Sequence, residues 1–292
     1  MKTILLTGAT GFLGSYLLEA LLQNNYQVVI LKRSTSNVWR IEHLLDKVNS
    51  YDVDCDCLQA AFTEQYIDAV IHTACCYGRH GESVSQVAEV NLVLGLNLLD
   101  ACLKYKVGIF CNTDTLLDKG INDYALSKHQ FSEWLKRRSH RIQIMNMKPD
   151  HMYGSKDDAT KFVPWLLAQF MNGATEVKLT SGEQHRDFIY IDDVVSAYMT
   201  VLNQAGELPP FSEFEVGTGS SIPVKSFIQS LKKRYDERFG LSPTYLNFGA
   251  IPYRDGEVMD FSVDNTSLRK LGWKPAHTLE QGLKLTIEDI KQ

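Results

Sequence analysis

Three things are scarce or absent in this sequence: net charge of one sign, a long apolar run, and cysteines in a metal-binding pattern. The formal net charge is only -5 over 292 residues, which argues against nucleic acid as the main partner. No segment approaches the apolar length that a bilayer span needs. The N-terminal residues 1–6 run straight into a glycine turn and indicate a strand rather than a signal peptide. We therefore expect a cytoplasmic protein that binds neither nucleic acid nor a membrane.

The six cysteines fall into no zinc-binding template. Their spacings are C-x-C and C-C, without the His or Cys partners that a zinc site requires, at Cys55, Cys57, Cys75, Cys76, Cys102 and Cys111. Four of them lie in or beside apolar patterns, so we expect buried thiols and no metal site. Repeats and low-complexity tracts are also absent.

What the sequence does have is a glycine-rich turn at its start. Residues 7–14 read Thr-Gly-Ala-Thr-Gly-Phe-Leu-Gly, after an apolar strand at 3–7 and before an apolar-periodic helix at 12–22. Gly8 permits the tight turn, Gly11 lets the backbone approach a pyrophosphate, and Gly14 lets the helix pack on the strand. The spacing is Gly-x-x-Gly-x-x-Gly rather than Gly-x-Gly-x-x-Gly. The free N–H groups of the helix would hold the anion.

The first half of the chain alternates strands and helices. Strands are predicted at residues 3–7, 27–31, 53–58, 69–73, 108–112 and 143–147, and several of them are near-continuous apolar runs, as expected for strands that are covered on both faces. Helices are predicted at 12–22, 87–104 and 124–136. This is the pattern of a doubly wound parallel sheet, the Rossmann type of α/β fold.

The pattern loosens beyond residue 150. Helices are predicted at 162–171, 224–234, 267–271 and 279–291, with short strands and turns between them. We expect two domains with interleaved segments. Residues 1–150 would form a dinucleotide-binding Rossmann domain, and residues 151–292 a smaller α+β lobe that binds the substrate.

A second motif places an acid/base pair on one helix. Tyr124 and Lys128 are four residues apart, which brings a phenol and an ammonium to the same helical face. Each of the two motifs is weak alone. Together they indicate a nucleotide cofactor beside a group that can exchange a proton.

The loop after the second strand bears on the choice of cofactor. An Asp or Glu there would bind the 2′-hydroxyl of the adenosine ribose. This chain has Lys32, Arg33 and Ser34 instead, and these suit a 2′-phosphate. We expect NADP(H) to be preferred, with NAD(H) as the alternative.

These motifs occur in the order found in a known family. The chain resembles the extended short-chain dehydrogenase/reductases, the NAD-dependent epimerase/dehydratase family, over essentially its whole length. Beside the glycine turn and the Tyr-x-x-x-Lys pair, the resemblance rests on His72-x-Ala74, Asn91, Tyr153-Gly154, residues 186–193 and residues 271–275. Members bind nucleotide-activated sugars and hold NAD(P) in the N-terminal domain, so the resemblance implies a nucleotide-sugar substrate.

The resemblance also implies roles for single residues. A Ser or Thr, the Tyr and the Lys act together in the family, and here they match Thr113, Tyr124 and Lys128. Lys128 would lower the pKa of Tyr124 and hold the nicotinamide ribose, Tyr124 would exchange a proton with the sugar oxygen, and Thr113 would orient that oxygen. The cofactor-binding set is Gly8, Thr10, Gly11, Phe12, Leu13, Gly14, Lys32, Arg33, Ser34, Ala74, Asn91, Tyr124, Lys128 and His151.

Substrate binding is assigned in the same way to Asp114, Lys161, Arg186 and Arg254, the two arginines facing the diphosphate. Several of these positions have a second interpretation. Lys161 is equally a solvated residue of the first helical turn. His151 is either a pocket residue or a packed histidine. Arg79 and His80 either line the sugar pocket or are solvated.

The residue at position 115 distinguishes the dehydratases of the family from its reductases and epimerases. Its sugar 4,6-dehydratases carry Thr-Asp-Glu where this chain has Thr113-Asp114-Thr115, and a threonine cannot act as the base. The resemblance therefore favours an enzyme that transfers only a hydride and a proton, either a 4-ketoreductase or a 4-epimerase. The basic loop favours the reductase, because cells keep NADPH reduced. A non-catalytic dinucleotide-binding member is a third reading, but such proteins usually lose the Tyr or the Lys.

Within the family the chain resembles the bacterial CDP-abequose synthases, NADPH-dependent reductases of a CDP-4-keto-3,6-dideoxyhexose. This likeness rests on residues 112–114, 161–164, 180–184, 186–193, 248–251 and 254–255. It implies a role in surface polysaccharide (O-antigen) sugar synthesis. Family members also pair two long helices with a second copy, and the matching segments here, 87–104 and 124–136, predict a homodimer.

Overall fold

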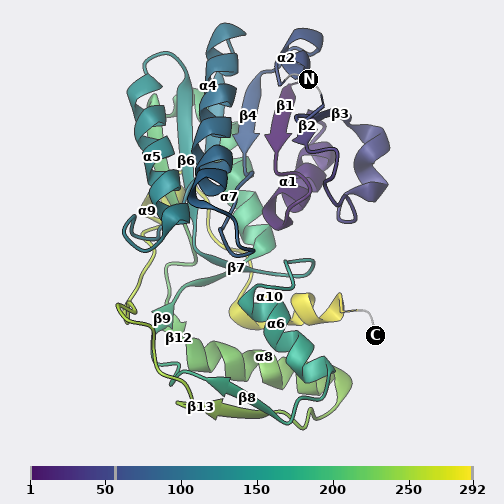
Figure 1. Cartoon of the computed structure of the whole chain (residues 1–292), viewed down its shortest axis with the longest axis vertical. Helices are drawn as coiled ribbons and strands as arrows, with labels where there is room; N and C mark the ends of the chain where they lie inside the picture. The colour runs from purple at the N-terminus through teal and green to yellow at the C-terminus, as the bar shows by residue number, and fades with distance from the viewer. Residues whose placement is uncertain (1, 56–57, 291–292) are drawn as a thin grey trace. The chain divides into compact units, whose positions relative to one another are not determined.

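The computed structural model describes residues 2–55 and 58–290. The chain divides into two compact units, one formed by Met1–Pro149 with Val195–Glu215 and the other by Asp150–Val194 with Val216–Gln292. The first unit is therefore discontinuous in sequence, because the chain leaves it after residue 149 and returns at residue 195. Figure 1 shows the elements of both units and labels many of them.

A seven-stranded sheet forms the centre of the first unit (Figure 1). Its strands lie in the order β11-β6-β5-β4-β1-β2-β3, and the pairs from β3 to β6 are all parallel. The strands are β1 (Thr3–Thr7), β2 (Gln27–Lys32), β3 (Asn49–Asp52), β4 (Ala69–His72), β5 (Ile109–Thr113), β6 (Gln143–Pro149) and β11 (Phe211–Val216). The order 3-2-1-4-5-6 is that of the doubly wound dinucleotide fold, so the predicted fold class is confirmed.

Apolar side chains join this sheet to helices. Leu98 of α4 (Leu94–Lys104) and Phe131 of α5 (Asp123–Arg138) belong to one buried cluster with Leu5, Val70 and Phe110 of the strands. The first unit also contains α1 (Phe12–Gln23), η1 (Glu42–Lys47), α2 (Ala60–Glu64), α3 (Val84–Ala88), η2 (Glu89–Val93), most of α7 (Ile191–Asn203) and η3 (Ala205–Glu207). Side chains alternate along a strand, so Thr113 lies on the opposite face of β5 from Phe110.

Segments α3, η2 and α4 follow one another without a break. They form a helical run of 21 residues, Val84–Lys104, that is long and apolar enough by length and composition to cross a membrane. The expectation that no segment reaches this length was wrong, because the helix begins three residues earlier than predicted. Buried core helices pass the same test, and Leu98, Leu99 and Cys102 of this run are buried in the sheet cluster.

The second unit is built from helices and short strand pairs. Its elements are β7 (His151–Tyr153), α6 (Phe162–Met171), β8 (Glu176–Leu179), β9 (His185–Arg186), β10 (Phe188–Tyr190), β12 (Ile222–Pro223), α8 (Val224–Phe239), β13 (Tyr245–Phe248), α9 (Thr266–Lys270) and α10 (Leu279–Glu288). Strand β10 pairs with β7, β12 with β9 and β13 with β8. Aromatic rings fill the core. The rings of Phe188 and Phe227 stack with their centroids 3.7 Å apart, and Tyr153 packs edge-on against Phe227.

One predicted strand is misplaced. Residues 53–55 form a turn, residues 56–57 lie outside the described part of the chain, and the strand is β3, at Asn49–Asp52. Its register with β2 places Asn49 opposite Val29 and Asp52 opposite Lys32. Tertiary pairing has therefore outweighed the apolar alternation of residues 53–58.

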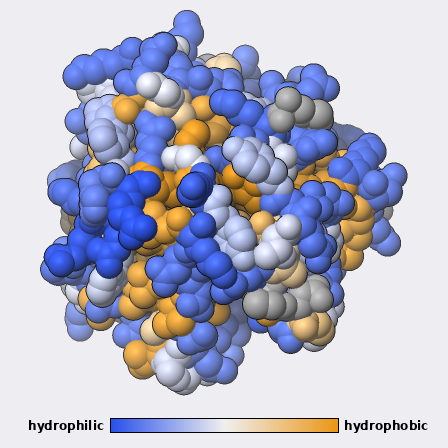
Figure 2. Space-filling model, turned by 90° about the horizontal axis from the view of Figure 1, so that it is seen from above, coloured by the Kyte–Doolittle hydropathy of each residue, from blue (hydrophilic) through white to orange (hydrophobic). Residues whose placement is uncertain are grey.

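Surface character is mixed. In the face that Figure 2 presents, most residues are hydrophilic and the hydrophobic ones fall into separate patches. Several large apolar side chains are exposed, among them Tyr66, Trp134 and Leu241.

Candidate active site

The glycine turn has the close packing that its spacing predicts. Gly8 adopts a φ of +72°, and a Cβ at this position would lie 2.7 Å from the backbone nitrogen of Ala74 at the end of β4. A Cβ on Gly14 would overlap the carbonyl group of Gly8. Helix α1 follows Gly11 and has no side-chain cap, so the N–H groups of its first turn, at Phe12 and beyond, remain available. The turn fits the phosphate groups of a dinucleotide.

A buried pair connects the two central strands beneath this turn. Thr7 Oγ1 lies 2.7 Å from His72 Nδ1, and it accepts a hydrogen bond from the backbone N–H of Ala74 at 3.3 Å. Burial lowers the pKa of His72 to about 3. His72 is therefore neutral and acts as a packed histidine.

Asn91 holds the chain that follows β4. Its amide accepts from the backbone N–H of Cys76 and donates to the carbonyl oxygen of Cys76, both at 2.8 Å, and it donates to Ser127 Oγ at 3.0 Å. Asn91 is fully buried in η2, a π-helical segment, and such segments are frequent at functional sites. Its side chain is occupied by these three bonds. It therefore acts on the predicted cofactor site by fixing residues 75–77 against α5.

Tyr124 lies among groups that the sequence analysis left open. Its ring centroid is 4.8 Å from that of Tyr77, and the guanidinium of Arg79 lies 5.4 Å from the Tyr77 centroid. The phenol also has a side-chain hydrogen bond with Thr115. Arg79 thus belongs to the surroundings of Tyr124, whereas the backbone N–H of His80 donates to the carboxylate of Glu82.

Burial raises the pKa of Tyr124 above its ordinary value, and the neighbouring Cys75 adds to this effect. The hydrogen bond with Thr115 and the charge of Arg79 act in the opposite direction. The lowered pKa expected for Tyr124 is therefore wrong for this structure, because burial dominates. Because its pKa is raised, the phenol stays protonated at neutral pH, and the protonated form is the one that donates a proton.

Lys128 lies one helical turn further along α5. It is 1% exposed, and its Nζ has no hydrogen-bond partner among the described residues. Burial lowers the pKa of Lys128, while Cys75 and Asp114 oppose that shift. An orphaned buried ammonium is costly, so this atom fits a ligand with acceptor oxygens, such as the ribose hydroxyls of a dinucleotide.

Thr113 and Asp114 at the end of β5 each have a buried neighbour. Thr113 Oγ1 lies 2.8 Å from the phenol oxygen of Tyr198 on α7, a residue that the sequence analysis missed. Asp114 is 2% exposed. Its Oδ2 accepts from Asn146 at 2.8 Å and its Oδ1 has no partner among the described residues. The predicted catalytic residues Thr113, Tyr124 and Lys128 all lie in the first unit.

Two carboxylates lie beside the basic loop, although none is found at the end of β2. Asp52 forms an ion pair with Lys32. Asp54 accepts hydrogen bonds from the backbone N–H of Ser34 at 2.8 Å and from its hydroxyl at 2.7 Å. They have no signal in the loop that follows β2, because Asp52 ends the neighbouring strand, β3, and Asp54 lies just beyond it. They balance part of the positive charge, and Arg33 stays exposed beside Asp54.

Arg40 is a further residue that the motif analysis missed. Its guanidinium donates to the carbonyl oxygen of Thr10 at 3.1 Å and lies 4.5 Å from the centroid of the Trp39 ring. This contact places a cation at the glycine turn. In the sequence, Arg40 is marked only by its place as the third cationic residue of the segment 32–40, after Lys32 and Arg33.

The cysteines are free thiols where the structure describes them. Cys102 and Cys111 are buried as expected, Cys55 is exposed, and Cys57 lies outside the described residues. Cys75 and Cys76 are only part-buried, and Cys75 lies beside Tyr124 and Lys128.

Four predicted site residues belong to the second unit. Arg186 forms an ion pair with Glu257 and donates to two backbone carbonyl groups, so a diphosphate would share this guanidinium with a carboxylate. Arg254 is exposed. Lys161 precedes α6, whose N-terminus has no side-chain cap. His151 Nδ1 lies 2.9 Å from Asp150 Oδ1, and its side chain is 43% exposed.

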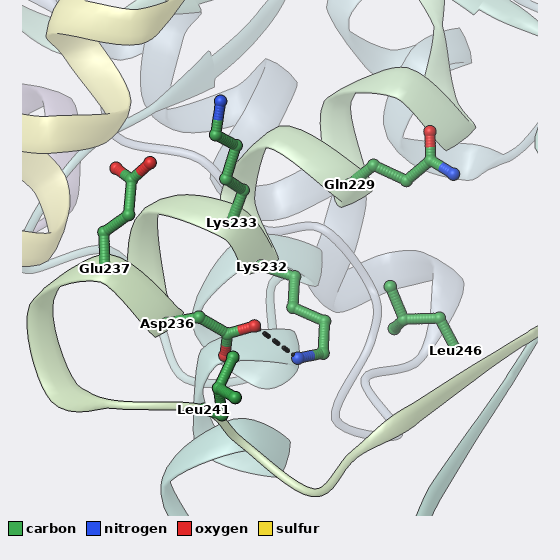
Figure 3. Close-up of a pocket in the computed structure, with 7 residues that line it drawn as sticks. All are labelled: Gln229, Lys232, Lys233, Asp236, Glu237, Leu241 and Leu246. Carbon is green, nitrogen blue, oxygen red and sulfur yellow. Dashed lines mark hydrogen bonds and ion pairs between the residues drawn. The ribbon is translucent and has the colours of Figure 1, made fainter.

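Figure 3 shows a hollow elsewhere on the second unit, and it contains none of the predicted site residues. It is lined by Gln229, Lys232, Lys233, Asp236, Glu237, Leu241 and Leu246. Lys232 and Asp236 are paired with each other at 2.6 Å. This pair lies within α8 and stabilises it.

Comparisons with known proteins agree with the fold. A family model described as the NAD dependent epimerase/dehydratase family matches residues 4–217. A CDP-abequose synthase of Salmonella typhimurium is 33% identical over 299 residues, covering 98% of this chain and 98% of the relative. A putative UDP-glucose 4-epimerase of Methanocaldococcus jannaschii is 25% identical, covering 99% and 98%.

Among solved structures, the UDP-glucose 4-epimerase of Thermotoga maritima, crystallised with UDP-glucose, matches with a TM-score of 0.83. It is 24% identical and the match covers 98% of this chain and 97% of that one. At this identity the likeness shows the fold alone.

Proposed function

The chain belongs to the NAD dependent epimerase/dehydratase family, and on that basis we propose that this NAD(P)-dependent enzyme reduces the 4-keto group of a nucleotide-activated deoxyhexose. One observation carries the proposal. Tyr124, Lys128 and Thr113 gather at the carboxyl end of β5 and the start of α5, in the same unit as the uncapped glycine turn. Ligands of doubly wound sheets bind beyond the carboxyl ends of the strands.

The chemistry needs one hydride and one proton. A bound nicotinamide cofactor would supply the hydride to the carbonyl carbon. Tyr124 gives its phenolic proton to the carbonyl oxygen, so the ketone becomes an alcohol and the phenol a phenolate. Lys128 stabilises that phenolate through its charge and would hold the ribose hydroxyl oxygens of the cofactor. Thr113 donates a hydrogen bond that orients the reacting oxygen.

The residue at position 115 supports reduction over dehydration. Elimination requires a base to remove a proton next to the ketone. Thr115 has no carboxylate, and its hydroxyl is bonded to Tyr124. Asp114 is buried against Asn146. Hydride and proton transfer need neither an acidic residue at 115 nor a free carboxylate at 114.

The cofactor that we propose is NADP(H). Arg33 would be the main residue to hold the 2′-phosphate, because Lys32 and Ser34 are already bonded to Asp52 and Asp54. The same two carboxylates favour a second candidate function. A carboxylate near the ribose suits NAD, which makes a 4-epimerase with bound NAD the alternative.

The substrate that we propose carries a CDP group and serves surface polysaccharide synthesis. The support is the relative of Salmonella typhimurium, whose likeness extends over 98% of both chains. We also propose that Lys161, Arg186 and Arg254 of the second unit contribute to nucleotide-sugar binding. The guanidinium and ammonium groups suit a diphosphate.

The test is turnover with a panel of 4-keto sugars. The protein is incubated with NADPH and with CDP-, dTDP-, UDP- and GDP-linked 4-keto sugars, and oxidation of NADPH is followed. We expect the highest rate with the CDP sugar, and no oxidation when the sugar is left out. A parallel incubation with the corresponding 4-hydroxy sugars tests the alternative. Their interconversion, with no oxidation of NADPH by any 4-keto sugar, would identify the epimerase and overturn the reductase.

A further inference from the structure

We infer that Tyr198 is a positioning residue that fixes the direction of the Thr113 hydroxyl group, so that Thr113 donates its own proton to the reacting oxygen. The inference rests on the proposed function, because it concerns how that site orients its substrate. Tyr198 lies 85 positions beyond Thr113 in the sequence, on α7, in the segment that returns to the first unit.

The contact is short and buried. The two hydroxyl oxygens are 2.8 Å apart, and Tyr198 is 1% exposed. Thr113 is the one hydrogen-bond partner that the described residues offer to the Tyr198 phenol. Burial raises the pKa of Tyr198 well above its ordinary value, so the phenol keeps its proton.

The direction of this hydrogen bond follows from counting protons. A buried phenol whose proton is not donated loses a hydrogen bond that water would have made, and that loss is unfavourable. Thr113 Oγ1 is the available acceptor, so Tyr198 donates and Thr113 accepts. The proton of Thr113 is then not used in this bond, and no described residue accepts it.

Thr113 itself remains partly exposed at the end of β5, where the strand gives way to Asp114. Its free proton therefore faces the place where a ligand oxygen can accept it. Tyr124 and Asp114 act electrostatically on Tyr198, which places the phenol beside the proposed proton donor. In a chain running from Tyr198 through Thr113 to the ligand, each hydrogen bond polarises the next.

A double-mutant cycle tests the inference. Single-turnover oxidation of NADPH with the preferred 4-keto sugar is measured for the parent protein, Tyr198→Phe, Thr113→Ala and the double variant. Loss of one neutral hydrogen bond corresponds to a rate reduced about three- to tenfold. We expect Tyr198→Phe to cause this loss while the dissociation constant for NADPH stays unchanged. In the Thr113→Ala background the same change should have no further effect.

Two further variants make the cycle specific. Thr113→Ser keeps the hydroxyl and should keep the sensitivity to Tyr198→Phe. Tyr198→His keeps a hydrogen-bond donor, the N–H of the ring, and should recover part of the rate. It also replaces Tyr198→Phe in the cycle if that variant does not fold. Tyr26→Phe is the matched control, because it removes a phenol bonded to Asn203 at 3.0 Å, at the end of the same helix. It should leave the rate unchanged.

The possible results distinguish failure of the positioning role of Tyr198 from failure of the proposed function. If Tyr198→Phe lowers the rate equally with and without the Thr113 hydroxyl, or changes only NADPH binding, the positioning role is wrong and the proposed function stands. If the parent protein neither reduces a 4-keto sugar nor interconverts 4-hydroxy sugars, the proposed function is wrong and the positioning role falls with it. The parent protein alone reveals that second failure.

Discussion

At the scale of single residues, the chemistry depends on Tyr124 and Lys128. Tyr124→Phe should reduce single-turnover oxidation of NADPH by about a hundredfold to ten-thousandfold, because the proton donor is lost, while NADPH still binds. Lys128→Met should weaken both the rate and NADPH binding, since the ammonium has two roles. Retention of more than about a tenth of the parent rate in Tyr124→Phe would show that another group gives the proton.

The same two residues set the alkaline limit of the reaction. Burial raises the pKa of Tyr124 and lowers that of Lys128, so Lys128 is the first of the two to lose its proton as the pH rises. We expect the rate of reduction to fall in a step centred below the ordinary lysine pKa of about 10.4. Lys128→Arg, whose cation does not titrate in this range, should move or abolish that step. An identical alkaline profile in the two proteins would contradict this assignment.

The buried His72 makes the free energy of unfolding depend on pH in the acidic range. Its pKa is about 3 in the folded protein and about 6.5 when unfolded. The unfolded chain therefore binds more protons between these values. Stability from this residue is complete above pH 6.5 and falls as the pH drops toward 3, by at most about 1.4 kcal/mol per pH unit.

Urea unfolding at several pH values between 4 and 7 measures this effect. His72→Gln, which does not titrate, should show a free energy of unfolding that varies less with pH than that of the parent protein. The exposed His80 provides the control, and His80→Gln should keep the parent slope. Equal slopes for His72→Gln and the parent would rule out the buried neutral histidine.

Residues with local signals are the ones that sequence alone can find. The glycine turn and the Tyr124–Lys128 pair are defined by spacings of three and four positions. Tyr198 and Asp54 have no such signal, because each acquires its role from a partner on another strand or helix. The pKa of Tyr124 was also beyond sequence reasoning, since it depends on how completely the fold buries the phenol.

At the scale of elements, strand β3 influences the choice of cofactor. Asp54, just beyond β3, binds Ser34 and faces Arg33. Asp54→Asn removes a negative charge that repels a 2′-phosphate, so NADPH affinity should rise several-fold relative to NADH. Arg33→Ala should lower it by a similar factor. Isothermal titration with both cofactors measures this ratio, and equal affinities of the parent protein for NADPH and NADH would overturn the proposed preference.

Strand and helix predictions fail where tertiary pairing decides. Strand β1 and helix α6 begin and end where the sequence predicts them. Strand β3 lies four residues earlier than predicted, because β2 selects its partner by register. Helix α7 was not predicted, although Val194, Tyr198 and Val201 recur at helical spacing and all are buried. Its membership of the first unit depends on contacts that no local pattern contains.

At the scale of the whole molecule, we predict a homodimer. Leu126 and Trp134 of α5 are 41% and 43% exposed, and they lie eight positions apart on one helical face. Sedimentation should give a dimer at micromolar concentration, and Trp134→Glu should shift it toward the monomer. Tyr245→Glu, at an exposed aromatic residue of the second unit, is the control. A monomeric parent protein would refute the prediction.

The return of the chain to the first unit affects how the protein folds while the ribosome synthesises it. Synthesis proceeds from the N-terminus, so six strands of the central sheet emerge before α7 and β11 exist. The hydrogen bond between Thr113 and Tyr198 therefore cannot form until residues 150–194 have been translated and residue 198 has followed. The nascent chain therefore exposes an unfinished sheet edge at β6 during that interval, and such edges are where newly made proteins associate wrongly. The speed of translation through residues 150–215 thus bears on how much active protein a cell obtains.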